Sequence, residues 1–311
     1  MNIALIAHGG AGSWRPGTDA EATEGMRAAV VAGRKILVAG GSALDAVCAT
    51  VVALEDNPIF NAGTGACLNI DGFCELDACV MESTDERAGA VAALQRVKNP
   101  ILVARKVMEE TDHVMLGGEG ALRFARVMGF GDYDPVTPAR RKDWQDKLDS
   151  IGNAPTKRSL KNREFLKKHP AYSGGTVGAS AIDAAGVLAA ATSTGGVTLK
   201  MVGRVGDTPI PGAGNYASSH VAASATGTGE FVMRTLATRA ISEAVAQGAT
   251  LADAVRAILD HMGRQFDADV GIIAVDRNGV TVAQHRTPAM PHAYFEGNGE
   301  IVARMRCASK D

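Results

Sequence analysis

The sequence lacks any apolar run long enough to cross a membrane. Its hydrophobic stretches, such as residues 3–7, are far shorter than the roughly 20 residues that a spanning helix needs. The N-terminus has no charged region followed by a cleavage site. It also lacks a charge excess, because 32 Lys and Arg stand against 34 Asp and Glu, for a net charge of −2. Such a balance favours neither nucleic acid nor an anionic membrane as a partner. We therefore expect a cytoplasmic protein whose partner is a small molecule.

Several motifs of well-known site types are also missing. The five cysteines are odd in number and form no CxxC pair, so we expect buried free thiols and neither a disulfide framework nor a thiolate zinc site. There is no HExxH pair for a metalloenzyme and no GxSxG elbow for an α/β-hydrolase triad. The segment 10–15 has Arg15 where a dinucleotide loop needs its third glycine. The segment 226–230 lacks the Lys-Ser/Thr of a Walker loop, which leaves either a plain turn or a helix N-terminus suited to a carboxylate or an oxyanion.

What the chain does have is glycine, at 36 residues, and enough apolar residues, at 46%, for a substantial core. Apolar spacing and turn residues predict strands and helices in both halves. Ser42 with Asp45, and Thr250 with Asp253, form capping pairs at helix starts, and Asn278-Gly279 is a strong hairpin signal. The expected strands are residues 3–8, 73–82, 88–94, 176–183 and 187–194, and the expected helices are residues 19–39, 100–110, 119–128 and 230–246, with one more after each capping pair. We expect an α/β (α+β) fold with helices outside two stacked sheets.

The stretch from Pro138 to Pro170 differs from the rest in composition. It holds ten Lys and Arg against four Asp and Glu. A polar, proline-bounded stretch of this length is more typical of a mobile connector than of a packed element, although a short helix around Trp144 is compatible with it. The connector ends just before a buried strand that begins at Thr176.

The junction Gly174-Gly175-Thr176 has the groups that self-cleavage needs, a threonine hydroxyl next to a peptide carbonyl. If the Thr176 hydroxyl attacks the carbonyl of Gly175, the peptide becomes an ester, and hydrolysis of the ester exposes a new N-terminal threonine. The α-amine of that threonine, with a reference pKa near 8, can then act as the base for its own hydroxyl. We expect glycine before the threonine to permit strained backbone angles and to leave the carbonyl open. From this segment alone, a glycine-rich entry to a strand remains the simpler explanation.

A set of ordered motifs carries a resemblance to a known family. They are Gly175-Thr176-Val177-Gly178-Ala179, Ala191-Thr192-Ser193-Thr194-Gly195-Gly196, Gly203-Arg204-Val205-Gly206-Asp207, Pro211-Gly212-Ala213-Gly214 and Thr226-Gly227-Thr228-Gly229-Glu230. The N-terminal half adds His8-Gly9-Gly10-Ala11-Gly12, Asn61-Ala62-Gly63 and Glu75-Leu76-Asp77-Ala78-Cys79-Val80-Met81. Together they resemble the plant-type L-asparaginase and isoaspartyl peptidase family over nearly the whole chain apart from the connector.

The resemblance implies a four-layer αββα sandwich of the N-terminal-nucleophile (Ntn) hydrolase class, with mainly antiparallel sheets. It implies a single domain over residues 1–311 that cuts itself between Gly175 and Thr176. The products would be an α subunit, residues 1–175 with the connector 138–174 at its end, and a β subunit, residues 176–311. Two αβ units would form a homodimer. The implied activity is hydrolysis of L-asparagine, of β-aspartyl dipeptides, or of both.

The resemblance also implies the roles of individual residues. Thr176 matches the nucleophile, Thr194 the threonine whose hydroxyl contacts it, and Asn61 the asparagine beside it. Thr226 and Gly227 match the oxyanion hole. Arg204 and Asp207 match the pair that binds the α-carboxylate and α-ammonium of the substrate, with Gly229 joining through its backbone, and a guanidinium fork beside an aspartate suits such an amino-acid clamp. A structural sodium bound by backbone carbonyls would fall at Leu54, Glu55, Phe60 and Ala62, and no other cofactor is implied.

Two alternatives remain open. A glycosylasparaginase would have Asp where this chain has Gly175, and its closing motif differs from residues 227–230. An uncleaved protein of the same fold would bind an amino acid through Arg204 and Asp207 without catalysis, although it would have no need of Thr176, Thr194 and Thr226 together. The stretch 284–291 matches the family only loosely, so no substrate contact is assigned there.

Overall fold

The computed structural model describes residues 2–151 and 175–307. Its larger sheet has eight strands in the spatial order β12-β11-β1-β5-β6-β2-β3-β4, and neighbouring strands are antiparallel except for β3 and β4. Their bounds are β1 (Ala4–His8), β2 (Leu76–Glu82), β3 (Ala88–Leu94), β4 (Met115–Gly117), β5 (Val177–Ile182), β6 (Leu188–Thr194), β11 (His292–Glu296) and β12 (Val302–Arg304). The smaller sheet is antiparallel in the order β10-β9-β8-β7. Its strands are β7 (Asn215–Ala217), β8 (Val221–Gly227), β9 (Val270–Asp276) and β10 (Thr281–His285).

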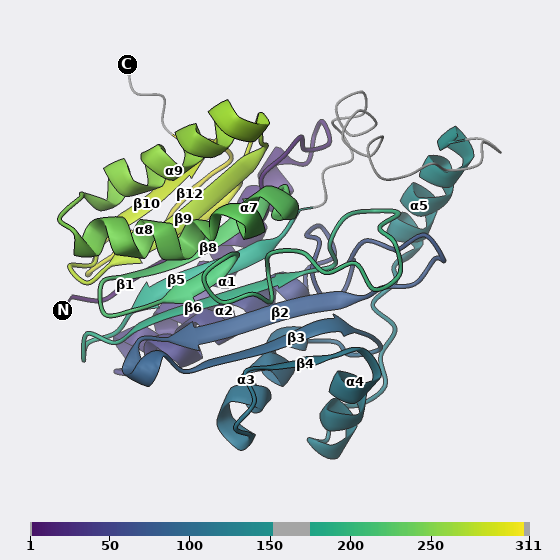
Figure 1. The fold of residues 1–311 in the computed structure, drawn as a ribbon, viewed down its shortest axis with the longest axis horizontal. Coiled ribbons are helices and arrows are strands. Elements are labelled where there is room, and N and C mark those ends of the chain that lie inside the picture. The colour runs from purple at the N-terminus through teal and green to yellow at the C-terminus, as the bar shows by residue number, and fades with distance from the viewer. Residues whose placement is uncertain (1, 152–174, 308–311) are drawn as a thin grey trace.

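Helices cover the outer faces of both sheets (Figure 1). Helices α1, α2 and α3 pack on the larger sheet, and α8 and α9 pack on the smaller one. The helices are α1 (Asp19–Val38), α2 (Ala43–Glu55), α3 (Pro100–Glu110), α4 (Gly118–Val127), α5 (Pro138–Ile151), α7 (Gly229–Thr235), α8 (Ala237–Ala246) and α9 (Leu251–Phe266), with a 3-10 turn at Thr84–Glu86. Among the residues with a described structure, none of these helices combines the length and apolarity that a bilayer crossing demands.

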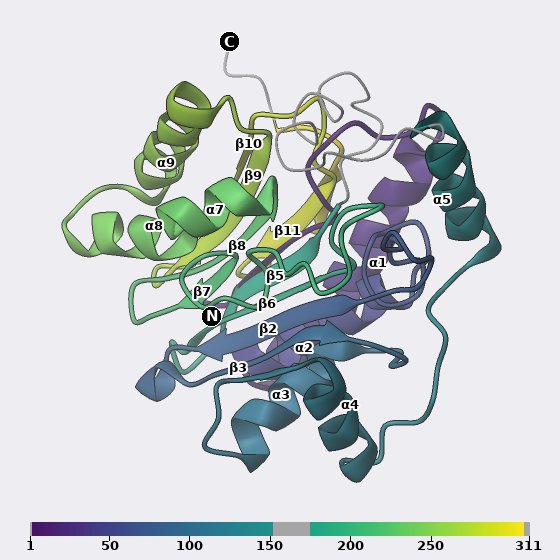
Figure 2. The same cartoon turned by 45° about the vertical axis from the view of Figure 1, so that its right-hand side comes forward.

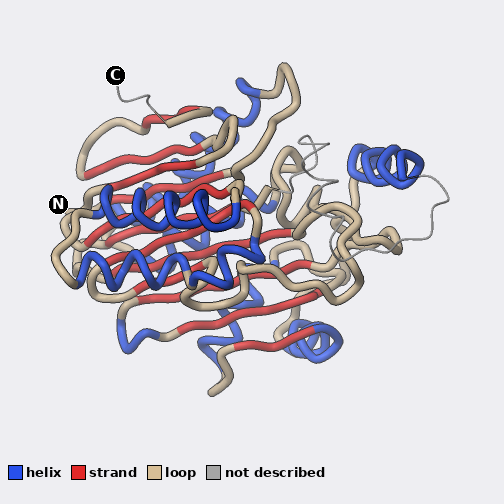
Figure 3. Tube along the Cα trace, turned by 45° about the horizontal axis from the view of Figure 1, so that its top comes forward, coloured by secondary structure: helices blue, strands red, loops and turns tan. Residues whose placement is uncertain are grey.

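Buried side chains between the layers hold this arrangement together. One cluster lies between the larger sheet and its helices and another lies between the smaller sheet and α7 to α9. A third, which includes Ile6, Leu188 and Ile273, lies between the two sheets. Turned views show the strands enclosed by helices on both sides (Figure 2, Figure 3). The expected four-layer αββα sandwich with mainly antiparallel sheets is confirmed.

The local signals in the sequence are largely confirmed. Ser42 and Thr250 each accept a hydrogen bond from the backbone N–H three residues on, at 3.0 and 3.2 Å, and so cap α2 and α9. The hairpin of β9 and β10 turns at Asn278-Gly279, where Gly279 has a φ of +80°. The hairpin of β5 and β6 has the expected register. All five cysteines are free, and only Cys307 is not fully buried.

The single helix expected over residues 230–246 is wrong. The structure breaks it at Leu236, which has a left-handed φ of 45° and separates α7 from α8. The backbone N–H groups of Thr238 and Arg239 donate to Ala213 and Gly212 at 3.3 and 3.0 Å instead of to the preceding turn. A contact with a distant loop thus replaces the local hydrogen bonds that would continue the helix.

The first part of the expected connector is packed against the rest of the protein, and it contains the short helix that the sequence allowed around Trp144. Residues 138–151 form α5, which packs through Trp144 against a small buried cluster containing Leu68 and Leu76. The indole Nε1 of Trp144 donates to the carbonyl of Asn69 at 2.8 Å. One tryptophan with a satisfied N–H is enough to anchor an otherwise polar helix. The rest of the expected connector, residues 152–174, lies outside the described residues.

Candidate active site

Thr176 and Thr194 lie side by side at the open end of the β5–β6 hairpin. Thr176 immediately precedes β5, Thr194 ends β6, and the Thr176 hydroxyl donates to Thr194 Oγ1 at 3.2 Å. Both side chains are buried, with 6% and 3% exposure. The backbone N–H of Gly196 also donates to Thr194 Oγ1 at 2.9 Å, which fixes that hydroxyl. The sheet therefore presents one hydroxyl with its neighbour as acceptor, as a nucleophile and its supporting group require.

The carbonyl oxygen of Gly175, which belongs to the peptide bond that self-cleavage would break, has two nearby side-chain donors. Asn61 Nδ2 donates to this oxygen at 2.5 Å, and the Thr194 hydroxyl lies 3.4 Å from it. Donors aimed at an oxygen where negative charge develops stabilise a tetrahedral intermediate. Asn61 and Thr194 thus both direct donors at the oxygen of Gly175.

Asn61 is held in place by contacts on both ends of its amide. Its Oδ1 accepts from the backbone N–H of Cys67 at 2.6 Å, and its Nδ2 also donates to the carbonyl of Gly196 at 2.7 Å. A Cβ on Gly195 would lie 2.7 Å from Asn61 Oδ1, so glycine is needed at that position. These partners fix which end of the amide faces Gly175.

Gly10 lies against the junction in a backbone conformation that favours glycine. Its φ is +110°. A Cβ on Gly10 would lie only 2.7 Å from Gly175 Cα and 3.0 Å from Thr176 N. The missing side chain lets the 175–176 peptide pass directly over Gly10. In the sequence, Gly10 stood out only as part of a glycine-rich motif, so its contact with the junction was missed.

Thr226 and Gly227 lie at the end of β8 in the smaller sheet. The Thr226 hydroxyl accepts a hydrogen bond from the backbone N–H of Ala11 at 3.2 Å, and Ala11 follows the glycine that contacts the junction. Gly227 has a φ of +123°, and a Cβ there would lie 2.2 Å from the carbonyl of Asp269. The structure therefore brings both residues to the same end of the sandwich as Thr176, without a direct hydrogen bond between Thr226 and Gly175. Their predicted role toward a substrate stays a prediction.

Arg204, Asp207 and Gly229 form one cluster, as the amino-acid clamp requires. A Cβ on Gly229 would lie 2.5 Å from Asp207 Oδ1 and 3.3 Å from Arg204 Nη2. Burial raises the pKa of Asp207 to about 7, and its Oδ2 has no hydrogen-bond partner. The Arg204 guanidinium donates through Nε and Nη2 to Glu230 Oε1 at 3.0 and 2.8 Å. The cluster thus offers a buried carboxyl oxygen for a cation and a guanidinium that already binds a carboxylate.

The comparisons with known proteins agree with this geometry. A family model described as Asparaginase matches residues 1–303. The chain belongs to this family. It is 48% identical to the plant-type L-asparaginase of Pyrococcus abyssi over 301 residues, which cover 96% of this chain and 98% of that protein. It is 40% identical to the isoaspartyl peptidase/L-asparaginase of Rattus norvegicus, over 97% of this chain and 89% of that protein.

In this asparaginase-family chain, Asp77 joins the nucleophile region to the clamp. Asp77 on β2 is the register partner of Thr194 on β6. Its Oδ1 accepts from the backbone N–H of Ala93 at 2.8 Å, and its Oδ2 accepts from that of Gly206, next to Asp207, at 3.4 Å. Burial raises its pKa, and Lys200 opposes that shift. The sequence showed Asp77 only as a motif position, although an acidic residue inside an apolar strand is itself a signal of a buried polar contact.

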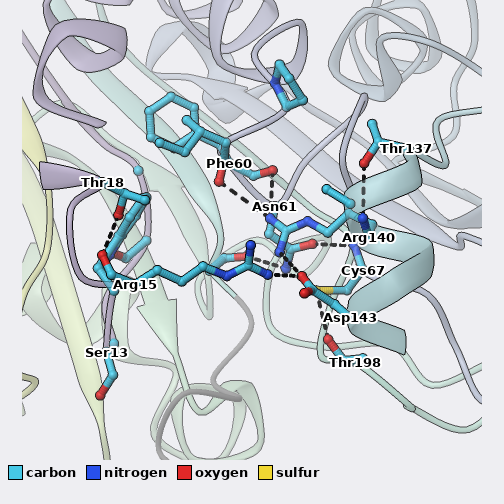
Figure 4. Close-up of a pocket in the computed structure, with 18 of the residues that line it drawn as sticks. Ser13, Arg15, Thr18, Phe60, Asn61, Cys67, Thr137, Arg140, Asp143 and Thr198 are labelled. Carbon is cyan, nitrogen blue, oxygen red and sulfur yellow. Dashed lines mark hydrogen bonds and ion pairs between the residues drawn. The ribbon is translucent and has the colours of Figure 1, made fainter. Parts of the chain in front are cut away.

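A cavity of about 760 Å³ opens on the Gly175 side of the junction (Figure 4). Its lining includes Gly10, Asn61, Arg140, Asp143 and Gly175. The clamp residues do not contribute to it. Among the described residues, the cavity and the clamp therefore share no residue.

Three of the four carbonyls predicted to bind the family's sodium already have protein partners. Leu54 O accepts from Asn57 N at 3.3 Å, and Glu55 O accepts from Thr64 N at 2.8 Å. Phe60 O accepts from the cationic guanidinium of Arg140 at 3.2 Å. Only Ala62, of the four, has no hydrogen bond recorded at its carbonyl. Three of the four carbonyl oxygens thus already accept hydrogen bonds within the protein, one of them from a cation. The sodium site stays a prediction.

Proposed function

We propose that this chain is a self-processing amidohydrolase that cuts between Gly175 and Thr176 and then hydrolyses L-asparagine, β-aspartyl dipeptides, or both. The observation that carries the proposal is the Thr176 hydroxyl beside Thr194, next to a Gly175 carbonyl that accepts a hydrogen bond from Asn61. The names of the relatives, L-asparaginase and isoaspartyl peptidase, support the substrate class. The products would be an α subunit of residues 1–175 and a β subunit of residues 176–311, assembled as a cytoplasmic homodimer of αβ units.

Self-cleavage begins with attack of Thr176 Oγ1 on the carbonyl carbon of Gly175. Thr194 Oγ1 accepts the hydrogen bond of the attacking hydroxyl, and Asn61 Nδ2 stabilises the charge on the carbonyl oxygen. Collapse of the intermediate breaks the C–N bond, and the nitrogen takes up a proton and becomes the α-amine of Thr176. Water then hydrolyses the ester, which leaves a carboxylate on Gly175 and restores the Thr176 hydroxyl.

The mature site would use the same hydroxyl on a substrate. Arg204 binds the α-carboxylate and Asp207 the α-ammonium, which places the side-chain carbonyl at Thr176. The freed α-amine accepts the proton of the hydroxyl as it attacks, and Thr226 and Gly227 stabilise the oxyanion. Ammonia or an amine leaves, and water releases the aspartyl ester. The clamp binds the aspartyl part alone, so it accepts both substrates.

Intact-mass spectrometry of the purified wild-type protein, with ammonia release from L-asparagine followed in parallel, tests the proposal. We expect the 311-residue chain to convert into two fragments that meet at the 175–176 bond, with activity rising as they appear. A chain that stays whole and inactive would contradict the proposal and favour an amino-acid-binding protein.

Substrate binding should weaken below neutral pH. Asp207 has a pKa of about 7, and only its ionised form attracts an ammonium, so protonation removes that attraction as the pH falls through 7. We expect the inhibition constant of the product L-aspartate to rise by about tenfold per pH unit below 7, because each unit lowers the ionised fraction tenfold. Inhibition measured from pH 5.5 to 8 checks this. A constant that stays flat over that range would show that Asp207 does not bind the ammonium in its ionised form.

A further inference from the structure

Helix α5 is fastened to the segment that carries Asn61 by side chains that donate to backbone carbonyls. Arg140 Nε donates to Gly65 O at 2.5 Å, and Trp144 Nε1 donates to Asn69 O at 2.8 Å. Arg141 Nη1 donates to Gly72 O at 3.0 Å. The first part of the expected connector is therefore docked on residues 59–72 rather than separate from them.

Arg140 differs from the other donors because its contacts flank Asn61. Its Nη2 lies 3.2 Å from the carbonyl of Phe60, which belongs to the peptide bond joining Phe60 to Asn61. The same nitrogen lies 3.5 Å from Ile59 O, while Nε binds Gly65 O on the other side of Asn61. Figure 4 shows the Arg140 guanidinium beside Phe60 and Asn61. A planar fork with fixed donor directions sets the orientation of the backbone it binds.

The orientation of that backbone decides where the Asn61 amide points. Asn61 Nδ2 is 2.5 Å from the oxygen of Gly175, a distance that leaves little room for displacement. The side chain is short, so rotation of the 60–61 peptide would move Nδ2 with it. Contacts with Cys67 N and Gly196 O fix the amide end, whereas Arg140 fixes the backbone end.

We propose that Arg140 is a positioning residue for self-cleavage, which holds the Asn61 backbone so that Asn61 Nδ2 meets the Gly175 carbonyl. This inference rests on the proposed function. It makes α5, the start of the connector, a part of the cleavage machinery rather than a spacer. It also implies that changes in α5 alter the rate of processing without altering the amino-acid clamp, because Arg140 does not contact Arg204 or Asp207.

The test compares the cleavage rates of Arg140→Met, Arg140→Lys and Arg140→Ala with that of the wild type, by intact mass over time. Methionine keeps the apolar stem without a donor, and lysine keeps one cationic donor. We expect the methionine and alanine variants to cleave about 10- to 100-fold more slowly, since a displacement of about 1 Å can cost 10²-fold. The lysine variant should lie between them and the wild type. Once cleaved, each variant should have the wild-type KM for L-asparagine within about twofold, because its clamp is intact.

Arg141→Ala is the matched control. Arg141 is the next residue of the same helix and also donates to a carbonyl, but its acceptor, Gly72, is not next to Asn61. We expect this variant to cleave at the wild-type rate. Equal slowing by Arg141→Ala would overturn the inference, as would wild-type cleavage by Arg140→Met or a KM that rises in step with the loss of cleavage. If the wild type itself does not cleave, the proposed function fails. If the wild type cleaves and the Arg140 variants cleave at the same rate, only the inference about Arg140 fails.

Discussion

Thr176→Ala is expected to stay a single chain of 311 residues that releases no ammonia from L-asparagine. The substitution removes the hydroxyl that donates to Thr194 and would attack Gly175, so neither the ester nor the new α-amine can form. Because one group serves both processing and turnover, activity should fall by at least about 10⁴-fold, as when other covalent nucleophiles are removed. Intact mass and a coupled ammonia assay measure the two effects on the same sample.

Two further variants keep this result interpretable. Thr176→Ser retains a hydroxyl and should still cleave, with activity after cleavage. Thr111→Ala removes a threonine hydroxyl that bonds only to backbone carbonyls and the His113 N–H at the end of α3, and should behave as the wild type. Fragments in the Thr176→Ala sample that meet at the 175–176 bond would exclude this threonine as the nucleophile.

Arg204→Ala is expected to cleave normally and then to hydrolyse L-asparagine poorly. The guanidinium contacts neither Gly175 nor Asn61 in the described structure, so processing does not depend on it. Truncating one partner of a charged, hydrogen-bonded pair costs about 2–5 kcal/mol, which corresponds to roughly 30- to 5,000-fold in kcat/KM. Separate measurement of fragment formation and of kcat/KM tests both halves of the expectation.

Arg239→Ala provides the comparison for Arg204. Arg239 also donates to a glutamate, Glu243, at 2.8 Å, but the pair is exposed on α8. Exposed pairs of this kind contribute roughly 0–1 kcal/mol, so this variant should keep its activity. If Arg204→Ala has a wild-type kcat/KM, the amino-acid clamp is elsewhere.

Local signals in the sequence predicted local structure well. The Ser42 cap, the Asn278-Gly279 turn and the β5–β6 hairpin depend on residues a few positions apart, so the sequence alone contains the cause. The break between α7 and α8 at Leu236 depends on carbonyls more than 20 residues away, and leucine itself is not a helix-breaking residue. Strand β8 was not predicted because it is buried on both faces and its small residues show no alternation.

The residues of the candidate site likewise divide into those that the sequence indicated and those that only the packing of the fold reveals. The segment around Thr176 alone did not distinguish a nucleophile from a strand entry, so the predicted roles of Thr176 and of the clamp residues came from the resemblance to a family. The contact of Gly10 with the cleavage junction joins residues 165 positions apart. The role proposed for Arg140 depends on a helix in a stretch whose composition is typical of a connector. Such contacts follow from the packing of the layers and leave no periodic trace in the sequence.

The strand order has a consequence for what cleavage would leave behind. In the larger sheet, β12 and β11 follow residue 176 in sequence, β1 precedes it, β5 and β6 follow it, and β2 to β4 precede it. The two products would therefore be interleaved, with shared seams between β11 and β1, β1 and β5, and β6 and β2. Backbone hydrogen bonds at all three seams would have to open before the pieces could part. A cut just before β5 would thus free one amine and one carboxylate, while three rows of backbone hydrogen bonds still join the two chains.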